Sequence, residues 1–174
     1  QRRCTVSIDR SGSAADTQAI SDYVRMYLDM HEAELGSTAD VKTAASLFAS
    51  MIYNNKERLS AGIICGGRER PEGGASYNIP HGGALVRPRR SIGGSGSTYI
   101  WGWCDANYRD GMTRQECEQF VRTGLALAMA RDGSSGGVIR TVTIDANGVE
   151  RKFVAGNLVP TFFQGEAMAL NRNL

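Results

Sequence analysis

Near the start of the chain, apolar side chains recur at helical spacing in two consecutive segments. The spacing predicts a helix from about residue 15 to 35, with one apolar face. Its apolar positions are Ile20, Val24, Tyr27, Leu28, His31 and Leu35. Gly36 stands where helices commonly end, and Ser37 or Thr38 can cap a second helix. The apolar positions of that helix are Val41, Ala45, Phe48 and Ile52. So short a turn predicts an αα-hairpin.

Short apolar runs, many of them β-branched, predict strands on both sides of this helix pair. The expected strands are 4–8, 61–65, 75–79, 83–86, 138–144 and 149–154. A small-residue turn over 10–15 should lead from the first strand into the first helix. Pro88 ends the fourth strand, and Asp145 to Gly148 is a strong hairpin signal between the last two. Residues 91–97 form a glycine–serine loop that leads into the aromatic stretch 99–103.

One further helix carries the clearest start signal in the chain. Thr113 and Glu116 have the spacing of a capping box, and the pattern breaks at Asp132 and Gly133. The predicted buried positions are Phe120, Val121, Leu125, Ala128 and Met129. The order is therefore strand, two helices, several strands, one helix and two strands. Helices and strands in blocks indicate an α+β layered domain rather than a βαβ repeat.

Composition and charge narrow the class of protein. The 174 residues are 41% hydrophobic and carry a net charge of only +2, as expected of one globular domain over 1–174. This balance gives no support to nucleic-acid or membrane-surface binding. No window approaches a bilayer span, and no signal peptide is visible. The four cysteines occur singly, which favours reduced thiols in a cytosolic or nuclear protein over zinc ligands or disulfides.

Two glycine–serine loops, 93–97 and 132–137, are the candidate sites that residue types alone suggest, because glycine lets a ligand approach the backbone. Neither has the spacing of a phosphate-binding or dinucleotide-binding loop. Plain turns remain the alternative for both. His31 and His81 lack the partners of a Ser–His–Asp or Cys–His enzyme, and no metal-ligand motif occurs.

Longer strings carry a more specific signal than these spacings. In this order along the chain, four strings resemble the caspase-like catalytic β subunits of the eukaryotic 20S proteasome. They are Arg10–Gln18, Ser91–Ser97, Tyr108–Thr113 with Glu116 and Cys117, and Arg131–Gly137. These subunits are N-terminal-nucleophile hydrolases, and the resemblance covers the chain from about residue 10 to 154.

The resemblance implies a four-layer α/β/β/α sandwich, with the family's first hairpin missing from this chain. It implies proteasome α and β subunits as partners, in stacked seven-membered rings, with unfolded polypeptide as substrate. The expected role is ubiquitin-dependent protein degradation in the cytoplasm and nucleus, with no metal or organic cofactor. The tail 157–174 is expected either to cross a neighbouring subunit or to pack locally.

The family's chemistry implies a role for particular residues. An N-terminal threonine attacks the peptide carbonyl, and its α-amine or a nearby lysine takes the proton. By resemblance, Ser95, Asp132 and Ser135 support that threonine through hydrogen bonds. Gly12 matches the residue whose backbone N–H stabilises the oxyanion, a role that leaves no room for a side chain.

Substrate contacts follow from the same resemblance. Arg10 matches a basic residue that would bind a glutamate or aspartate preceding the cleaved bond. Ala14 matches a residue whose backbone pairs with the extended substrate. The matching threonine lies upstream of Gln1, so the chain as printed is expected to be inactive by itself. A noncatalytic structural subunit of the β ring is the alternative.

Overall fold

The computed structural model describes residues 5–69 and 73–162, and the chain forms two compact units. The first unit holds residues up to 94 together with 144–149, and the second holds 95–143 together with residues from 150 on. The expectation of a single domain over 1–174 stays a prediction.

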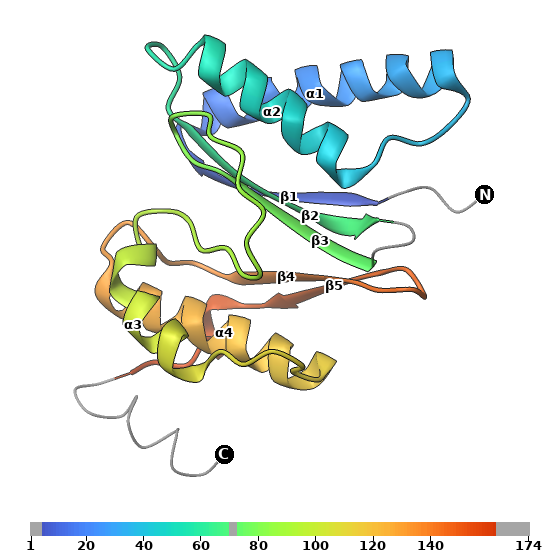
Figure 1. Cartoon of the computed structure of the whole chain (residues 1–174). Helices are drawn as coiled ribbons and strands as arrows, with labels where there is room; N and C mark the ends of the chain where they lie inside the picture. The colour runs from blue at the N-terminus through green and yellow to red at the C-terminus, as the bar shows by residue number, and fades with distance from the viewer. Residues whose placement is uncertain (1–4, 70–72, 163–174) are drawn as a thin grey trace. The chain divides into compact units, whose positions relative to one another are not determined.

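The first unit is a three-stranded antiparallel sheet with two helices. The strands are β1 (Val6–Gly12), β2 (Ala61–Glu69) and β3 (Gly73–Ile79), in the order β1-β2-β3. Helices α1 (Ala14–Leu35) and α2 (Val41–Asn54) lie over one face of this sheet (Figure 1). They bury Ile20, Val24, Phe48 and Ile52 against Ile63, Cys65, Tyr77 and Ile79.

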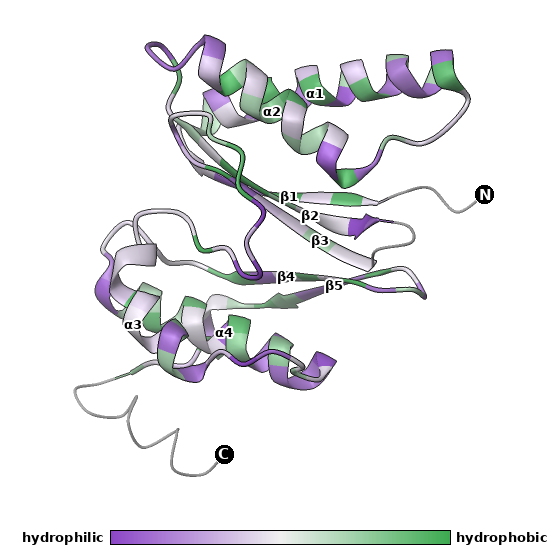
Figure 2. Ribbon diagram, viewed as in Figure 1, coloured by the Kyte–Doolittle hydropathy of each residue, from purple (hydrophilic) through white to green (hydrophobic). Residues whose placement is uncertain are grey.

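Helix ends in this unit confirm one sequence prediction and correct another. Gly36 ends α1 with φ of 64°, a conformation that glycine adopts without a steric penalty. The second helix, however, begins later than expected, because Asp40 rather than Ser37 or Thr38 accepts a hydrogen bond from the backbone N–H of Thr43. Figure 2 shows hydrophobic residues recurring among hydrophilic ones along both helices, as the helical spacing predicted.

Three expectations for the first unit are wrong. Residues 10–12 continue β1 instead of forming a turn, because they pair with Ile63 to Ala61. Residues 83–86 are not a strand: one isolated bridge joins Val86 to Asn78, after a turn through two glycines. Tyr27 is 45% exposed and Leu35 is 62% exposed, so the buried face of α1 is narrower than its spacing suggested.

The second unit contains a helix that the strand-like aromatic stretch concealed. Helix α3 (Ser97–Asn107) precedes α4 (Arg114–Arg131), and the hairpin strands β4 (Ile139–Ile144) and β5 (Val149–Val154) follow. Ile100 and Cys104, four residues apart, are buried, and Trp103 stacks on Phe120 of α4 with ring centroids 4.9 Å apart. Helix packing therefore overrides the β propensity of the aromatic residues. The predicted hairpin is confirmed, and a short 3₁₀ turn follows it (Gly156–Leu158).

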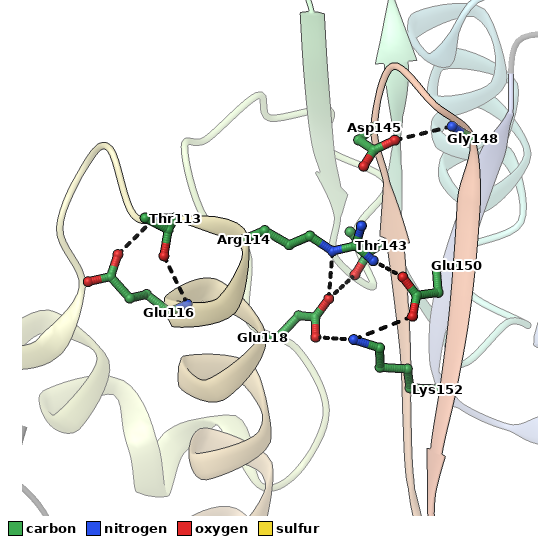
Figure 3. A network of polar contacts seen from close by, with 9 residues as sticks. All are labelled: Thr113, Arg114, Glu116, Glu118, Thr143, Asp145, Gly148, Glu150 and Lys152. Atoms are coloured by element: carbon green, nitrogen blue, oxygen red, sulfur yellow. Dashed lines mark hydrogen bonds and ion pairs between the residues drawn. The ribbon is translucent and has the colours of Figure 1, made fainter.

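The start of α4 is fixed by the predicted capping box. The hydroxyl of Thr113 accepts from the backbone N–H of Glu116, whose carboxylate accepts from the backbone N–H of Thr113 over 2.7 Å (Figure 3). The expected burial of this helix is only partly correct, since Val121 is 40% exposed and Leu125 is 36% exposed. The predicted strand start at Cys4 and most of the tail 157–174 lie outside the described residues.

Charged side chains join α4 to the hairpin. The carboxylate of Glu118 accepts from Lys152 Nζ over 2.6 Å, from Arg114 Nε over 3.0 Å and from Thr143 Oγ1 over 3.0 Å (Figure 3). Arg114 also bonds Glu150. These hydrogen bonds, the one from Lys152 foremost, lower the pKa of Glu118 from 4.5 to about 2.

This network predicts acid sensitivity. Because the pKa of Glu118 is depressed in the folded state, its stabilising contribution is complete above the unfolded value and is lost as pH falls from about 4.5 towards 2. We expect Glu118→Gln to reduce the difference in melting temperature of the full chain between pH 7 and pH 3. Glu34→Gln, on the exposed side of α1, is the matched control. An unchanged difference in the Glu118 variant would contradict the interpretation.

Candidate active site

The end of α4 carries a carboxylate with two hydroxyl donors. Asp132 follows the last residue of the helix and is 7% exposed. Its Oδ2 accepts hydrogen bonds from Ser95 Oγ over 2.6 Å and from Ser135 Oγ over 2.5 Å. Its Oδ1 accepts from the backbone N–H of Ser134 over 3.1 Å. The structure thus brings together the three residues that resemblance assigned to support of the nucleophile.

Hydrogen bonding determines the charge of Asp132 and the direction in which the two serine hydroxyls donate. The hydroxyl of Ser135, then that of Ser95, then the N–H of Ser134 lower the pKa of Asp132, so this carboxylate is an anion at neutral pH. A serine hydroxyl has one proton and two lone pairs. Since both protons are donated to Asp132, the lone pairs of Ser95 and Ser135 stay available as acceptors. The cluster is therefore built to receive a hydrogen-bond donor, and its negative charge favours a cationic one.

Gly96 is a part of this cluster that sequence reasoning did not single out. A Cβ on this residue would lie 2.8 Å from Ser135 Oγ and 3.3 Å from Asp132 Oδ2. A side chain here would displace the hydroxyl from the carboxylate. The glycine–serine composition of 93–97 was the available signal, but it did not indicate which glycine needs the space.

Arg10, Gly12 and Ala14 lie in the first unit, where β1 passes into α1. Ser13 caps α1, and its backbone N–H donates to the carbonyl of Ser60 over 2.8 Å. Along two antiparallel strands, the pairs of directly opposite residues alternate between hydrogen-bonded and non-hydrogen-bonded pairs. Because Ser13 is bonded across to Ser60, the N–H of Gly12 faces away from β2, towards the free edge that β1 has in the described sheet.

Gly12 is held in a conformation that excludes other residues. Its φ is +104°, and a Cβ here would lie 2.3 Å from the carbonyl oxygen of Ser60. Ala14 is the first residue of α1, so its N–H has no acceptor within the helix. This short segment therefore carries two backbone N–H groups that neither β2 nor α1 accepts from.

Arg10 has a separate position on the strand. Side chains alternate along β1, so Arg10 shares a sheet face with Val6 and Ile8, which pack against the core. Arg10 itself is exposed, two residues before the end of β1. It pairs with Ile63 across the sheet. The guanidinium is therefore carried by the strand whose far end holds Gly12.

Two kinds of feature are absent from the described part of the chain. In residues 5–69 and 73–162, no group of three or more histidine, cysteine or acidic side chains is placed to hold a metal ion. Within the same described ranges, no helix has both the length and the apolar character that crossing a bilayer requires.

Comparison with known proteins gives the family. The family model described as proteasome subunit matches residues 5–144. The chain belongs to the proteasome subunit family. It is 60% identical over 156 residues to proteasome subunit beta type-6 of Dictyostelium discoideum, covering 90% of this chain and 73% of that protein. It is 49% identical over 156 residues to the probable proteasome subunit beta type-1 of Schizosaccharomyces pombe, covering 88% of this chain and 69% of that protein.

A plant relative is also a β-type proteasome subunit. Proteasome subunit beta type-6 of Arabidopsis thaliana is 49% identical over 152 residues, covering 87% of this chain and 65% of the relative. The chain thus spans about two thirds to three quarters of these relatives. Membership in the proteasome family implies assembly with other proteasome subunits, and the predicted α+β class is confirmed. The mixed helices and strands agree with the sandwich of N-terminal-nucleophile hydrolases.

The roles of the six site residues remain predictions, and the geometry of five of them can be stated. Ser95, Asp132 and Ser135 form one hydrogen-bonded cluster in the second unit. In the first unit, Gly12 and Ala14 present backbone N–H groups at the junction of β1 and α1.

Proposed function

We propose that this proteasome β-type subunit is a threonine-type endopeptidase of the core particle that cleaves peptide bonds after acidic residues. Its nucleophile would be an N-terminal threonine, released by processing, in a segment upstream of Gln1. The subunit would act on unfolded polypeptides in ubiquitin-dependent degradation, in the cytoplasm and nucleus, within stacked seven-membered rings of α and β subunits.

The observation that carries the proposal is the double donation of Ser95 and Ser135 to Asp132. When the threonine hydroxyl attacks, its proton passes to a base, and a free α-amine has a pKa of about 8, near working pH. The resulting ammonium is a cationic donor. Two serine oxygens with available lone pairs, backed by an ionised carboxylate, are suited to hold it.

The family resemblance assigns the other steps of the reaction to residues at the junction of β1 and α1. Attack on the carbonyl carbon places negative charge on its oxygen, and the outward N–H of Gly12 would stabilise that charge. An extended peptide would add to the edge of β1 and pair with the backbone at Ala14. As the intermediate collapses, the α-ammonium returns its proton to the nitrogen of the leaving peptide and the C–N bond breaks. Water, giving its proton to the α-amine, then attacks the acyl ester, and the threonine hydroxyl is restored as the acid product leaves.

Arg10 supports the preference for acidic residues. A guanidinium presents paired donors that match the two oxygens of a carboxylate, so glutamate or aspartate would be held by charge-assisted hydrogen bonds. A neutral isostere such as glutamine would lose the charge contribution.

The proposal is tested with the purified native particle and peptides that differ only by glutamate or glutamine before the cleaved bond. We expect faster hydrolysis of the glutamate peptide, and loss of this activity when the subunit is replaced by an Asp132 variant. If hydrolysis does not depend on this subunit at all, the alternative of a noncatalytic structural β-ring subunit takes its place.

A further inference from the structure

His81 lies in a turn that is fixed to the first unit. The turn follows β3, and the backbone N–H of Gly83 closes it on the carbonyl of Pro80 over 2.8 Å. Gly83 has φ of +79°, and a Cβ there would lie 2.6 Å from the backbone N of Tyr53 at the end of α2. Close backbone packing therefore holds this turn in place, although His81 itself is exposed.

The imidazole of His81 lies against the strand end that carries Gly12. A Cβ on Gly12 would be 3.1 Å from Cε1 of His81, and a Cβ on Gly62 would be 3.5 Å from its Nε2. Gly62 pairs with Ser11 on the neighbouring strand, and the hydroxyl of Ser11 donates to the carbonyl of Gly62 over 3.3 Å. Two glycines thus leave bare backbone here, and the exposed ring borders it.

A peptide that binds along this edge would pass beside the ring. Neutral imidazole donates one N–H and the protonated form donates two, so His81 can donate a hydrogen bond to an acceptor in either state. Arg10 is two residues before Gly12, about 7 Å along the strand. The two side chains would therefore meet different residues of the peptide.

We propose that His81 is a specificity-determining residue that donates a hydrogen bond to an acidic side chain of the bound peptide. The position it would recognise is other than the residue preceding the cleaved bond, which Arg10 would bind. This inference rests on the proposed function of the subunit.

The test uses assembled particles and a set of peptides with glutamate or glutamine at each position on either side of a fixed cleavage site. We expect His81→Leu to reduce the glutamate preference at one position by about 10- to 100-fold, the size of one hydrogen bond to a charged group. The change should appear in KM more than in kcat. His81→Gln retains a donor and should keep part of the preference, while native gels confirm assembly of each variant.

Each outcome separates the two proposals. If His81→Leu leaves every glutamate preference unchanged while Arg10→Ala removes the one before the cleaved bond, only the role of His81 is overturned. Equal losses for glutamate and glutamine peptides would also overturn it, because such a contact does not distinguish a carboxylate from an amide side chain. If the native subunit hydrolyses no glutamate peptide, the proposed function fails and this inference with it.

Discussion

Asp132→Asn is expected to lower turnover by this subunit about 100-fold, the order of effect seen when one preorganised electrostatic group is removed from an active site. Asparagine keeps the shape of the side chain but removes its charge. The amide also offers one acceptor oxygen where the carboxylate offers two, so Ser95, Ser134 and Ser135 can no longer all be satisfied as they are now. The loss should appear in kcat, measured on a glutamate peptide with assembled particles.

Two comparisons make the Asp132 result specific. Asp22→Asn removes an exposed carboxylate from α1 and should leave turnover unchanged. Ser95→Ala and Ser135→Ala should each have a smaller effect than Asp132→Asn, because the other hydroxyl remains bonded to the carboxylate. If an assembled Asp132→Asn particle retains full turnover at this subunit, the cluster has a structural role and not a catalytic one.

The second large effect is expected for Arg10→Ala. A hydrogen bond to a charged group contributes about 1.5–3 kcal/mol, so losing it should cost about 10- to 100-fold in kcat/KM for a glutamate peptide. Hydrolysis of the matching glutamine peptide should change little. Because the side chain of Arg10 is exposed and packs into no core cluster, assembly should be spared.

Variants of other arginines control for charge alone. Arg25→Ala removes an exposed guanidinium from α1 and should not alter the ratio of glutamate to glutamine hydrolysis. Arg10→Lys keeps the charge without the paired donors and should fall between the wild type and Arg10→Ala. Unaltered glutamate hydrolysis in Arg10→Ala would show that the acidic preference, if present, arises elsewhere.

Local signals predicted the parts of the fold that local chemistry determines. The capping box at Thr113, the glycine that ends α1 and the hairpin turn at Asp145 each depend on residues within four positions of one another. Helix α3 was missed because its aromatic residues have strand propensity, whereas tertiary packing, including that of Trp103 on Phe120, favours the helical form. The single bridge at Val86 likewise depends on tertiary pairing.

The candidate site likewise combines features that local sequence indicates with contacts that only the folded chain creates. The glycine–serine loops were visible, but Ser95 and Asp132 are 37 positions apart, and no local pattern indicates that they share a hydrogen bond. Resemblance to a family supplied that pairing. Nothing local singles out His81, since its position beside Gly12 depends on a contact between residues 69 positions apart that only the folded sheet creates.

The most direct test of a threonine nucleophile is the N-terminal sequence and intact mass of this subunit, isolated from the native particle. We expect a mature chain that begins with threonine, carries a free α-amine and has a mass above the 18.8 kDa of the printed sequence. A mature chain that begins with any other residue would rule out a threonine nucleophile in this subunit, because no threonine hydroxyl beside a free α-amine would then be available to the cluster at Asp132.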